Sequence, residues 1–119
     1  MSIFSSQGLF LFEKWGDGMK LTIINVRKAL INNQIVLCKF VQDKMLQRGY
    51  SKRDVIKCIW TAEITGVQVH SGMLRVVLEG LDAHDNPIVC VIGKNHKNQN
   101  QLKIYNLFPP TNETYRRVN

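Results

Sequence analysis

The sequence has few cysteines, few prolines and no long apolar run, and each shortage excludes a class of protein. Its 119 residues include three cysteines and three prolines. No C-x-x-C pair is present, so we expect neither a disulfide framework nor a paired-thiol metal site. No run of about 18 apolar residues exists, which argues against a membrane-spanning helix. The first twelve residues lack the basic region and cleavage site of a signal peptide, so we expect a cytoplasmic protein without membrane contact.

The cysteines themselves lie inside apolar, periodic segments. Cys38, Cys58 and Cys90 are therefore predicted to be buried free thiols in a reducing compartment. A catalytic cysteine is the alternative interpretation, but apolar surroundings favour a role in the core.

Motifs for metals and cofactors are also missing. The sequence has no H-x-x-x-H pair, no calcium loop of the required length, no glycine-rich phosphate loop and no G-x-S-x-G. The three histidines, His70, His84 and His96, fall in predicted turns. We therefore expect no metal and no cofactor.

What the chain does have is an excess of positive charge. Sixteen Lys and Arg residues against nine Asp and Glu residues give a net charge of +7. Such a balance favours an anionic partner through long-range attraction and counterion release. RNA and an acidic protein both fit, and a merely soluble cationic surface remains an alternative.

The length suits a single domain, which we place at residues 19–110. Residues 1–18 end in a glycine-rich cluster and are predicted to form an N-terminal arm. Residues 111–119 are predicted to be a basic tail. Trp15 and Trp60 are predicted to be core anchors.

Helical spacing dominates the first half of this domain. Apolar residues predict one helix from Leu21 to the Asn32–Asn33 pair and a second from Val36 to Gly49. Gly49 is a typical helix end, and Ser51 with Asp54 predicts the capped start of a third, short helix.

After Trp60 the apolar period changes to that of strands. Residues 62–69 predict an edge strand, 73–79 an amphipathic strand, 88–92 a central strand and 102–108 a last strand. The expected fold class is α+β, with two to three N-terminal helices packed on a small antiparallel β-sheet of three to four strands.

The junction between the second and third helices resembles an uncharacterised family of small bacterial domains related to RelE-like toxins and the barnase-type ribonuclease fold. That family's pattern is Arg-Met-x-x-Arg-Gly-aliphatic-Ser-x-x-Asp-Val. The matching residues here are Met45, Arg48, Gly49, Ser51, Asp54 and Val55, with Lys44 in place of Arg and Tyr50 at the aliphatic position. The segment 104–110 resembles the family's terminal strand, and the resemblance covers residues 21–110.

The resemblance implies a toxin-like RNA-binding domain, an endoribonuclease of a toxin-antitoxin pair that acts on ribosome-bound RNA. Its protein partner would be an acidic antitoxin. Where the family has a His, this chain has Phe40. Either the general base is lost and the protein binds without cutting, or Phe40 is a harmless core replacement. The alternative function is a noncatalytic protein-interaction module of the same fold.

Candidate site residues follow from the chemistry of RNA cleavage, which needs a base, an acid and a cation for the phosphorane. Lys44 and Arg48 are four apart on one helical face, a spacing that lets two cations hold one phosphate. Arg75 and Glu79 share a strand face, and Lys103, Tyr105 and Leu107 are expected to share it on a neighbouring strand. The catalytic candidates are Lys44, Arg48, Arg75 and Tyr105, and the RNA-binding candidates are Lys39, Lys52, Arg53, Lys103 and Asn106. Solvated charges near a helix end are the alternative for Lys44 and Arg48, and a strand face that is polar for solubility alone is the alternative for the residues of the sheet.

Overall fold

The computed structural model describes residues 21–98 and 100–110. The predicted N-terminal arm, the basic tail and Trp15 lie outside these residues. In chain order, the described elements are α2 (Ile23–Ile31), β1 (Ile35–Leu37), α3 (Lys39–Arg48), α4 (Lys52–Thr61), β2 (Glu63–His70), β3 (Met73–Leu81), β4 (Pro87–Lys94) and β5 (Leu102–Phe108). The α+β class is therefore confirmed.

The sheet is larger than predicted and is not purely antiparallel. Among the described residues it has five strands in the order β1-β5-β4-β3-β2, and β1 runs parallel to β5 while the other neighbours are antiparallel. The prediction of three to four antiparallel strands is wrong because Val36 and Leu37, the predicted start of the second helix, belong to strand β1. A three-residue strand is too short for its periodicity to separate it from the helix that follows.

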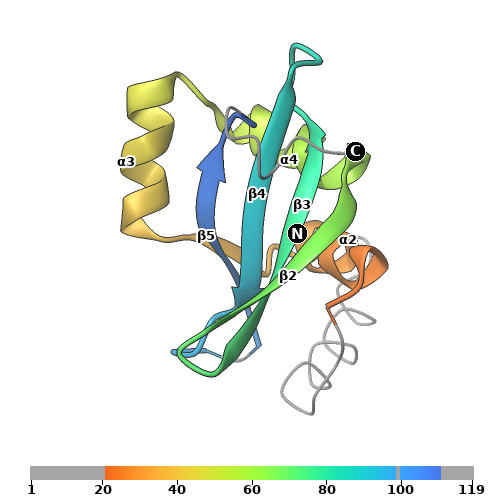
Figure 1. Cartoon of the computed structure of the whole chain (residues 1–119), viewed down its shortest axis with the longest axis vertical. Helices are drawn as coiled ribbons and strands as arrows, with labels where there is room; N and C mark the ends of the chain where they lie inside the picture. The colour runs from red at the N-terminus through yellow and green to blue at the C-terminus, as the bar shows by residue number, and fades with distance from the viewer. Residues whose placement is uncertain (1–20, 99, 111–119) are drawn as a thin grey trace.

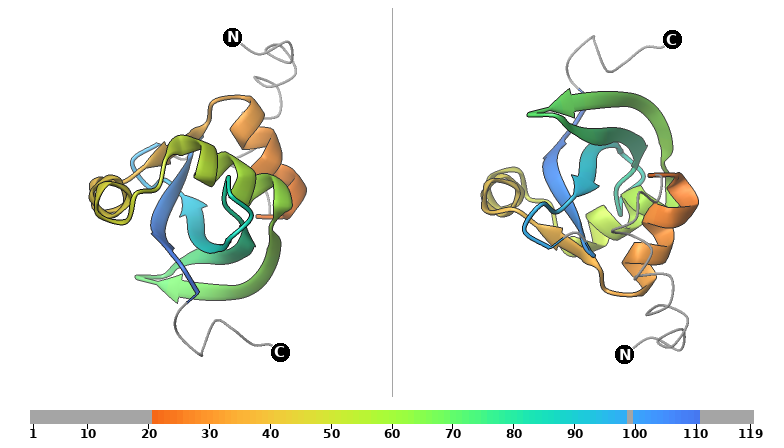
Figure 2. Two further views of the ribbon diagram at one scale, coloured as in Figure 1. Left: turned by 90° about the horizontal axis from the view of Figure 1, so that it is seen from above. Right: turned by 90° about the horizontal axis from the view of Figure 1, so that it is seen from below.

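The helices lie on one face and beside one edge of the sheet. Figures 1 and 2 show α4 and α2 on the same side of the sheet and α3 alongside β5. The strands follow an arc in both views of Figure 2, as expected from the twist of neighbouring strands.

The junction between α3 and α4 is built as the sequence predicts. Gly49 ends α3 in the left-handed region at φ 75°. Ser51 and Asp54 then form a capping box: the backbone N–H of Ser51 donates to Oδ2 of Asp54 at 2.7 Å. Asp54 also accepts from the backbone N–H of Ala83 through Oδ1 at 2.8 Å. One carboxylate thus ties the start of α4 to the turn between β3 and β4.

The end of α4 is held by a side chain from α2. The guanidinium of Arg27 donates to the carbonyl oxygens of Ile59, Trp60 and Ala62 at 3.1, 3.0 and 3.2 Å. These carbonyls belong to the last turn and have no partner within the helix, so a cation is well placed there.

The main core lies between the helices and the sheet. It includes Val41 and Met45 of α3, Ile59 of α4, and Leu78 and Ile92 of the sheet. A smaller cluster occupies the opposite face, where Val77, Val89 and Val91 are buried and Phe108 packs against them. Burial on both faces of β4 confirms it as the central strand.

Two of the three predicted thiols are buried. Cys58 and Cys90 lie inside the core, while Cys38 is only partly buried, and all three are free. Burial raises the pKa of Cys58 to about 12, and that of Cys90 lies well above its usual range for the same reason.

Two aromatic side chains predicted as core residues are on the surface. Trp60 is 47% exposed and Phe40 is 52% exposed. Both lie on the helix faces that point away from the core, and each is covered in part by a cation, Arg27 over Trp60 and Lys44 over Phe40. Within the described residues, no helix is long and apolar enough to cross a membrane.

Candidate nucleic-acid interface

Strand register places two predicted cations in one row across the sheet. Arg75 of β3 pairs with Gly93 of β4, and Gly93 pairs with Lys103 of β5. Val76 belongs to the core under the helices, so alternation puts Arg75 on the opposite face. No helix of the described residues covers that face (Figure 2), and we call it the helix-free face. The row therefore runs across three strands on that face.

Tyr105 joins this row through a stacking contact. The guanidinium carbon of Arg75 lies 3.7 Å from the centre of the Tyr105 ring, and Nζ of Lys103 lies 5.7 Å from it. The phenolic hydroxyl donates to the backbone oxygen of Lys94 at 2.7 Å, which fixes the ring. We call Arg75, Lys103 and Tyr105 the cationic cluster.

A β-bulge positions Tyr105. The register of β4 and β5 shifts between Val91 and Ile92, so that Tyr105 is the extra residue on β5. The bulge also turns Leu107 into the main core. The prediction that Leu107 shares a face with Lys103 and Tyr105 was therefore wrong, because the alternation is reset between them.

The charge of Arg75 is not neutralised within the described part of the chain. Ion pairs there join Lys39 to Asp43 and Lys57 to Asp85, and neither involves Arg75. The Nε atom of Arg75 is buried and has no hydrogen-bond partner in the part of the chain that the structure describes. The partly buried Arg75 side chain therefore carries a positive charge that no carboxylate of the described residues pairs with.

The environment of Tyr105 suits stacking better than proton transfer. Burial raises the pKa of its phenol, and the opposing influence of Arg75 does not cancel this. The hydroxyl is therefore protonated at neutral pH and already donates its proton to a backbone oxygen. It cannot accept the proton of an RNA 2′-hydroxyl in that state.

The predicted cations of α3 lie apart from this cluster. Nη1 of Arg48 donates to the carbonyl of Leu107 at 2.9 Å, at the stretch of β5 that extends beyond its pairing with β1. Lys44 lies over Phe40, and Lys39 pairs with Asp43. Among the contacts of the described residues, none joins these side chains to Arg75 or Tyr105.

The remaining predicted RNA-binding residues are also separate. Lys52 and Arg53 are exposed in the first turn of α4. The side-chain oxygen of Asn106 accepts from the backbone N–H of Leu107 at 2.9 Å. The structure thus brings together Arg75, Lys103 and Tyr105 of the nine candidates.

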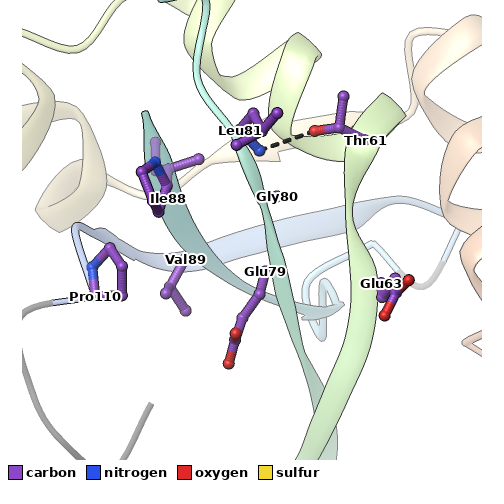
Figure 3. A pocket seen from close by; sticks show the side chains of 9 residues that line it. Thr61, Glu63, Glu79, Gly80, Leu81, Ile88, Val89 and Pro110 are labelled. Carbon is purple, nitrogen blue, oxygen red and sulfur yellow. Dashed lines mark hydrogen bonds between the residues drawn. The ribbon is translucent and has the colours of Figure 1, made fainter. Parts of the chain in front are cut away.

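A second row on the same face is acidic. Glu63 of β2 pairs directly with Glu79 of β3, and Thr65 donates to Oε2 of Glu79 at 2.9 Å. Both carboxylates line a pocket of about 300 Å³ that Val89 and Pro110 also line. Figure 3 shows Glu79 and Val89 projecting to one side of the sheet, with Pro110 and Glu63 at the two ends of the pocket. Glu79 is four residues from Arg75, about 13 Å along β3.

Sequence reasoning missed two parts of this surface. Gly93 gives the Arg75 side chain room to cross β4, and the only signal was a glycine directly after the apolar run 88–92. Glu63 was not singled out because its register with Glu79 depends on a bulge between Ile64 and Gly66.

No group of three potential metal ligands occurs in residues 21–98 and 100–110. Comparisons of the chain with family models, with curated proteins and with solved structures found no match. The interface is therefore interpreted from its own geometry and charge.

Proposed function

We propose that this protein binds RNA through the cationic cluster on the helix-free face of the sheet. The observation that carries the proposal is the stacking of Arg75, which forms no ion pair with another described residue, on Tyr105, with Lys103 beside them. Guanidinium and ammonium groups hold phosphates, and a base stacks on an aromatic ring or on the plane of a guanidinium such as the one that covers Tyr105. The net charge of +7 adds long-range attraction to the same ligand.

We also propose that the chain is related to RelE-like toxins, and the support for this is the short motif around Gly49. Such a relationship implies that the protein cleaves RNA in addition to binding it. The chemistry of the cluster favours binding, because Tyr105 is held protonated and the guanidinium of Arg48 is engaged with the backbone. We therefore propose binding as the primary activity.

The test measures RNA affinity by fluorescence anisotropy at several salt concentrations, with Lys103→Gln and Arg75→Gln as variants. Each lost phosphate contact should weaken binding and reduce the salt slope by about one. Lys28→Gln on α2 is the matched control, since it removes the same charge from outside the cluster.

Equal affinity of Lys103→Gln and Lys28→Gln would contradict the proposal, as would no RNA binding by the wild type at low salt. If Arg75→Gln does not fold, the comparison of Lys103→Gln with Lys28→Gln still tests the proposal. The same samples are analysed for RNA fragments. Intact RNA supports binding, while fragments that disappear in Arg75→Gln would identify an endoribonuclease.

One observation favours the second candidate, a protein-interaction module. The β2–β3 hairpin exposes Val67, Val69 and Leu74 by 60%, 70% and 52%, and β2 is an edge strand. Exposed apolar residues on the outermost strand of the described sheet are typical of strand addition by a partner. Coelution with a protein encoded by the neighbouring gene, lost in Val69→Lys, would support it. An RNA-free complex of this kind would favour it over RNA binding.

A further inference from the structure

We propose that the helix-free face selects single-stranded RNA over duplex RNA, and that Glu63 and Glu79 are the residues that reject the duplex. This inference rests on the proposed function, because it specifies the ligand of the same cationic cluster. It depends on two features of the face, a stacking ring at one end and paired carboxylates at the other.

The stacking ring demands an unpaired base. Tyr105 lies within the sheet face, held by its hydroxyl to Lys94 and covered in part by Arg75. In a duplex, each base is already stacked between its neighbours and faces its pairing partner. A base must leave that arrangement to reach an aromatic side chain, so aromatic platforms bind single strands.

The carboxylates limit where phosphates can lie. Glu63 and Glu79 are directly opposite each other, although like charges in this position destabilise a strand pair. Neither forms an ion pair with another described residue. Within residues 21–98 and 100–110, no cation neutralises these two negative charges, which lie on the same face as Arg75 at about 13 Å from it.

This spacing distinguishes the two forms of RNA. A single strand can follow the cationic row from Arg75 to Lys103, across the strands over about 10 Å, and need not approach the glutamates. A duplex presents two phosphate ridges on either side of a groove, and proteins that bind it contact both. With one ridge on Arg75 and Lys103, a duplex whose second ridge lies toward Glu63 and Glu79 is repelled by their carboxylates.

The experiment compares a 12-nucleotide RNA with its blunt-ended duplex of the same sequence by anisotropy at one low salt concentration. Wild type should bind the single strand at least tenfold more tightly. Tyr105→Leu should lose about tenfold in affinity for the single strand, with little change in affinity for the duplex. Tyr105→Phe keeps the stacking ring and loses only the hydrogen bond to Lys94, so it should lose less single-strand affinity than Tyr105→Leu. The double variant Glu63→Gln/Glu79→Gln should raise the affinity for the duplex several-fold, which lowers the ratio of single-strand to duplex affinity.

The matched control is Asp43→Asn/Asp85→Asn, which removes two carboxylates that lie in ion pairs elsewhere. It should leave the preference unchanged. If this control lowers the ratio of single-strand to duplex affinity as much as the glutamate variant does, the net charge of the protein sets the ratio and the location of the carboxylates does not. The inference is then wrong.

The two proposals fail in different ways. Equal wild-type affinity for both RNA forms, still weakened by Lys103→Gln, would overturn the single-strand inference and leave RNA binding intact. No binding of either form would overturn the proposed function itself. Because Glu63 is exposed and Glu79 is partly exposed, the glutamate variant does not disturb the core.

Discussion

A Cβ atom on Gly93 would lie 3.0 Å from Cγ of Arg75 and 2.9 Å from the carbonyl oxygen of Leu74. The absence of a side chain at this position therefore lets Arg75 lie across β4 toward Tyr105. The cationic cluster depends on a glycine that carries no chemistry of its own.

Gly93→Ala is predicted to displace Arg75 from Tyr105 and weaken RNA binding several-fold. The crowding against the backbone of Leu74 should also lower the free energy of unfolding by about 1–3 kcal/mol. Anisotropy and urea unfolding measure the two effects. Gly66→Ala is the control, because its Cβ would meet only the Val77 side chain at 3.6 Å. Equal RNA affinity of the two variants would contradict the role of Gly93.

Asp54→Asn is predicted to lower the free energy of unfolding by about 1–2 kcal/mol at pH 7. The carboxylate accepts hydrogen bonds from Ser51 and Ala83 that the amide cannot fully replace. Asp43→Asn, which breaks an exposed ion pair with Lys39, should cost less than about 0.5 kcal/mol.

The Asp54 contribution should depend on pH. Burial opposes ionisation of Asp54, but the hydrogen bonds from Ser51 and Ala83 outweigh it, so the pKa lies below its ordinary value of 3.8. A depressed folded-state pKa means that the stabilisation is present above 3.8 and is lost as pH falls through the lower folded-state pKa. Urea unfolding from pH 7 to pH 3 should therefore show wild type converging on Asp54→Asn. A constant difference would refute this linkage.

Arg27→Gln is predicted to lower the free energy of unfolding by about 2 kcal/mol, because three carbonyl oxygens at the end of α4 lose their donor. Arg27→Lys should recover part of the loss, since one ammonium keeps the charge but not the fork of donors. Lys28→Gln on the same helix should change stability by less than about 0.5 kcal/mol. A loss in Lys28→Gln as large as in Arg27→Gln would show that helix charge, not the capping contact, is responsible.

The three cysteines are predicted to differ in reactivity. Iodoacetamide at pH 8 should modify Cys38 first, because Cys58 has a pKa of about 12 and Cys90 is fully buried. Mass spectrometry of the folded protein measures the order. In urea all three should react, and modification of Cys58 in the folded state would contradict its burial.

Local signals in the sequence were reliable where a few neighbouring residues decide the structure. The end of α3 at Gly49 and the capping box of Ser51 and Asp54 are such cases, because cap geometry involves residues at most three positions apart. The central position of β4 also follows from its composition, since a strand that is apolar on both faces must be covered on both.

Other features were wrong or invisible because they depend on distant partners. The strand β1 exists only through its pairing with β5, and three residues carry too little pattern to reveal it. The exposure of Trp60 and Phe40 depends on which helix face meets the sheet, which spacing alone does not decide.

The sequence by itself determined the α+β class, the helix caps, the central strand and the positive charge, because each depends on composition or on short-range geometry. Only the tertiary structure decided which of the candidate side chains are in contact. Arg75 and Tyr105 are 30 residues apart, and strand register, the bulge at Tyr105 and the open space at Gly93 together bring them into contact. Register is set by the packing of the whole sheet, so no local pattern in the chain specifies it.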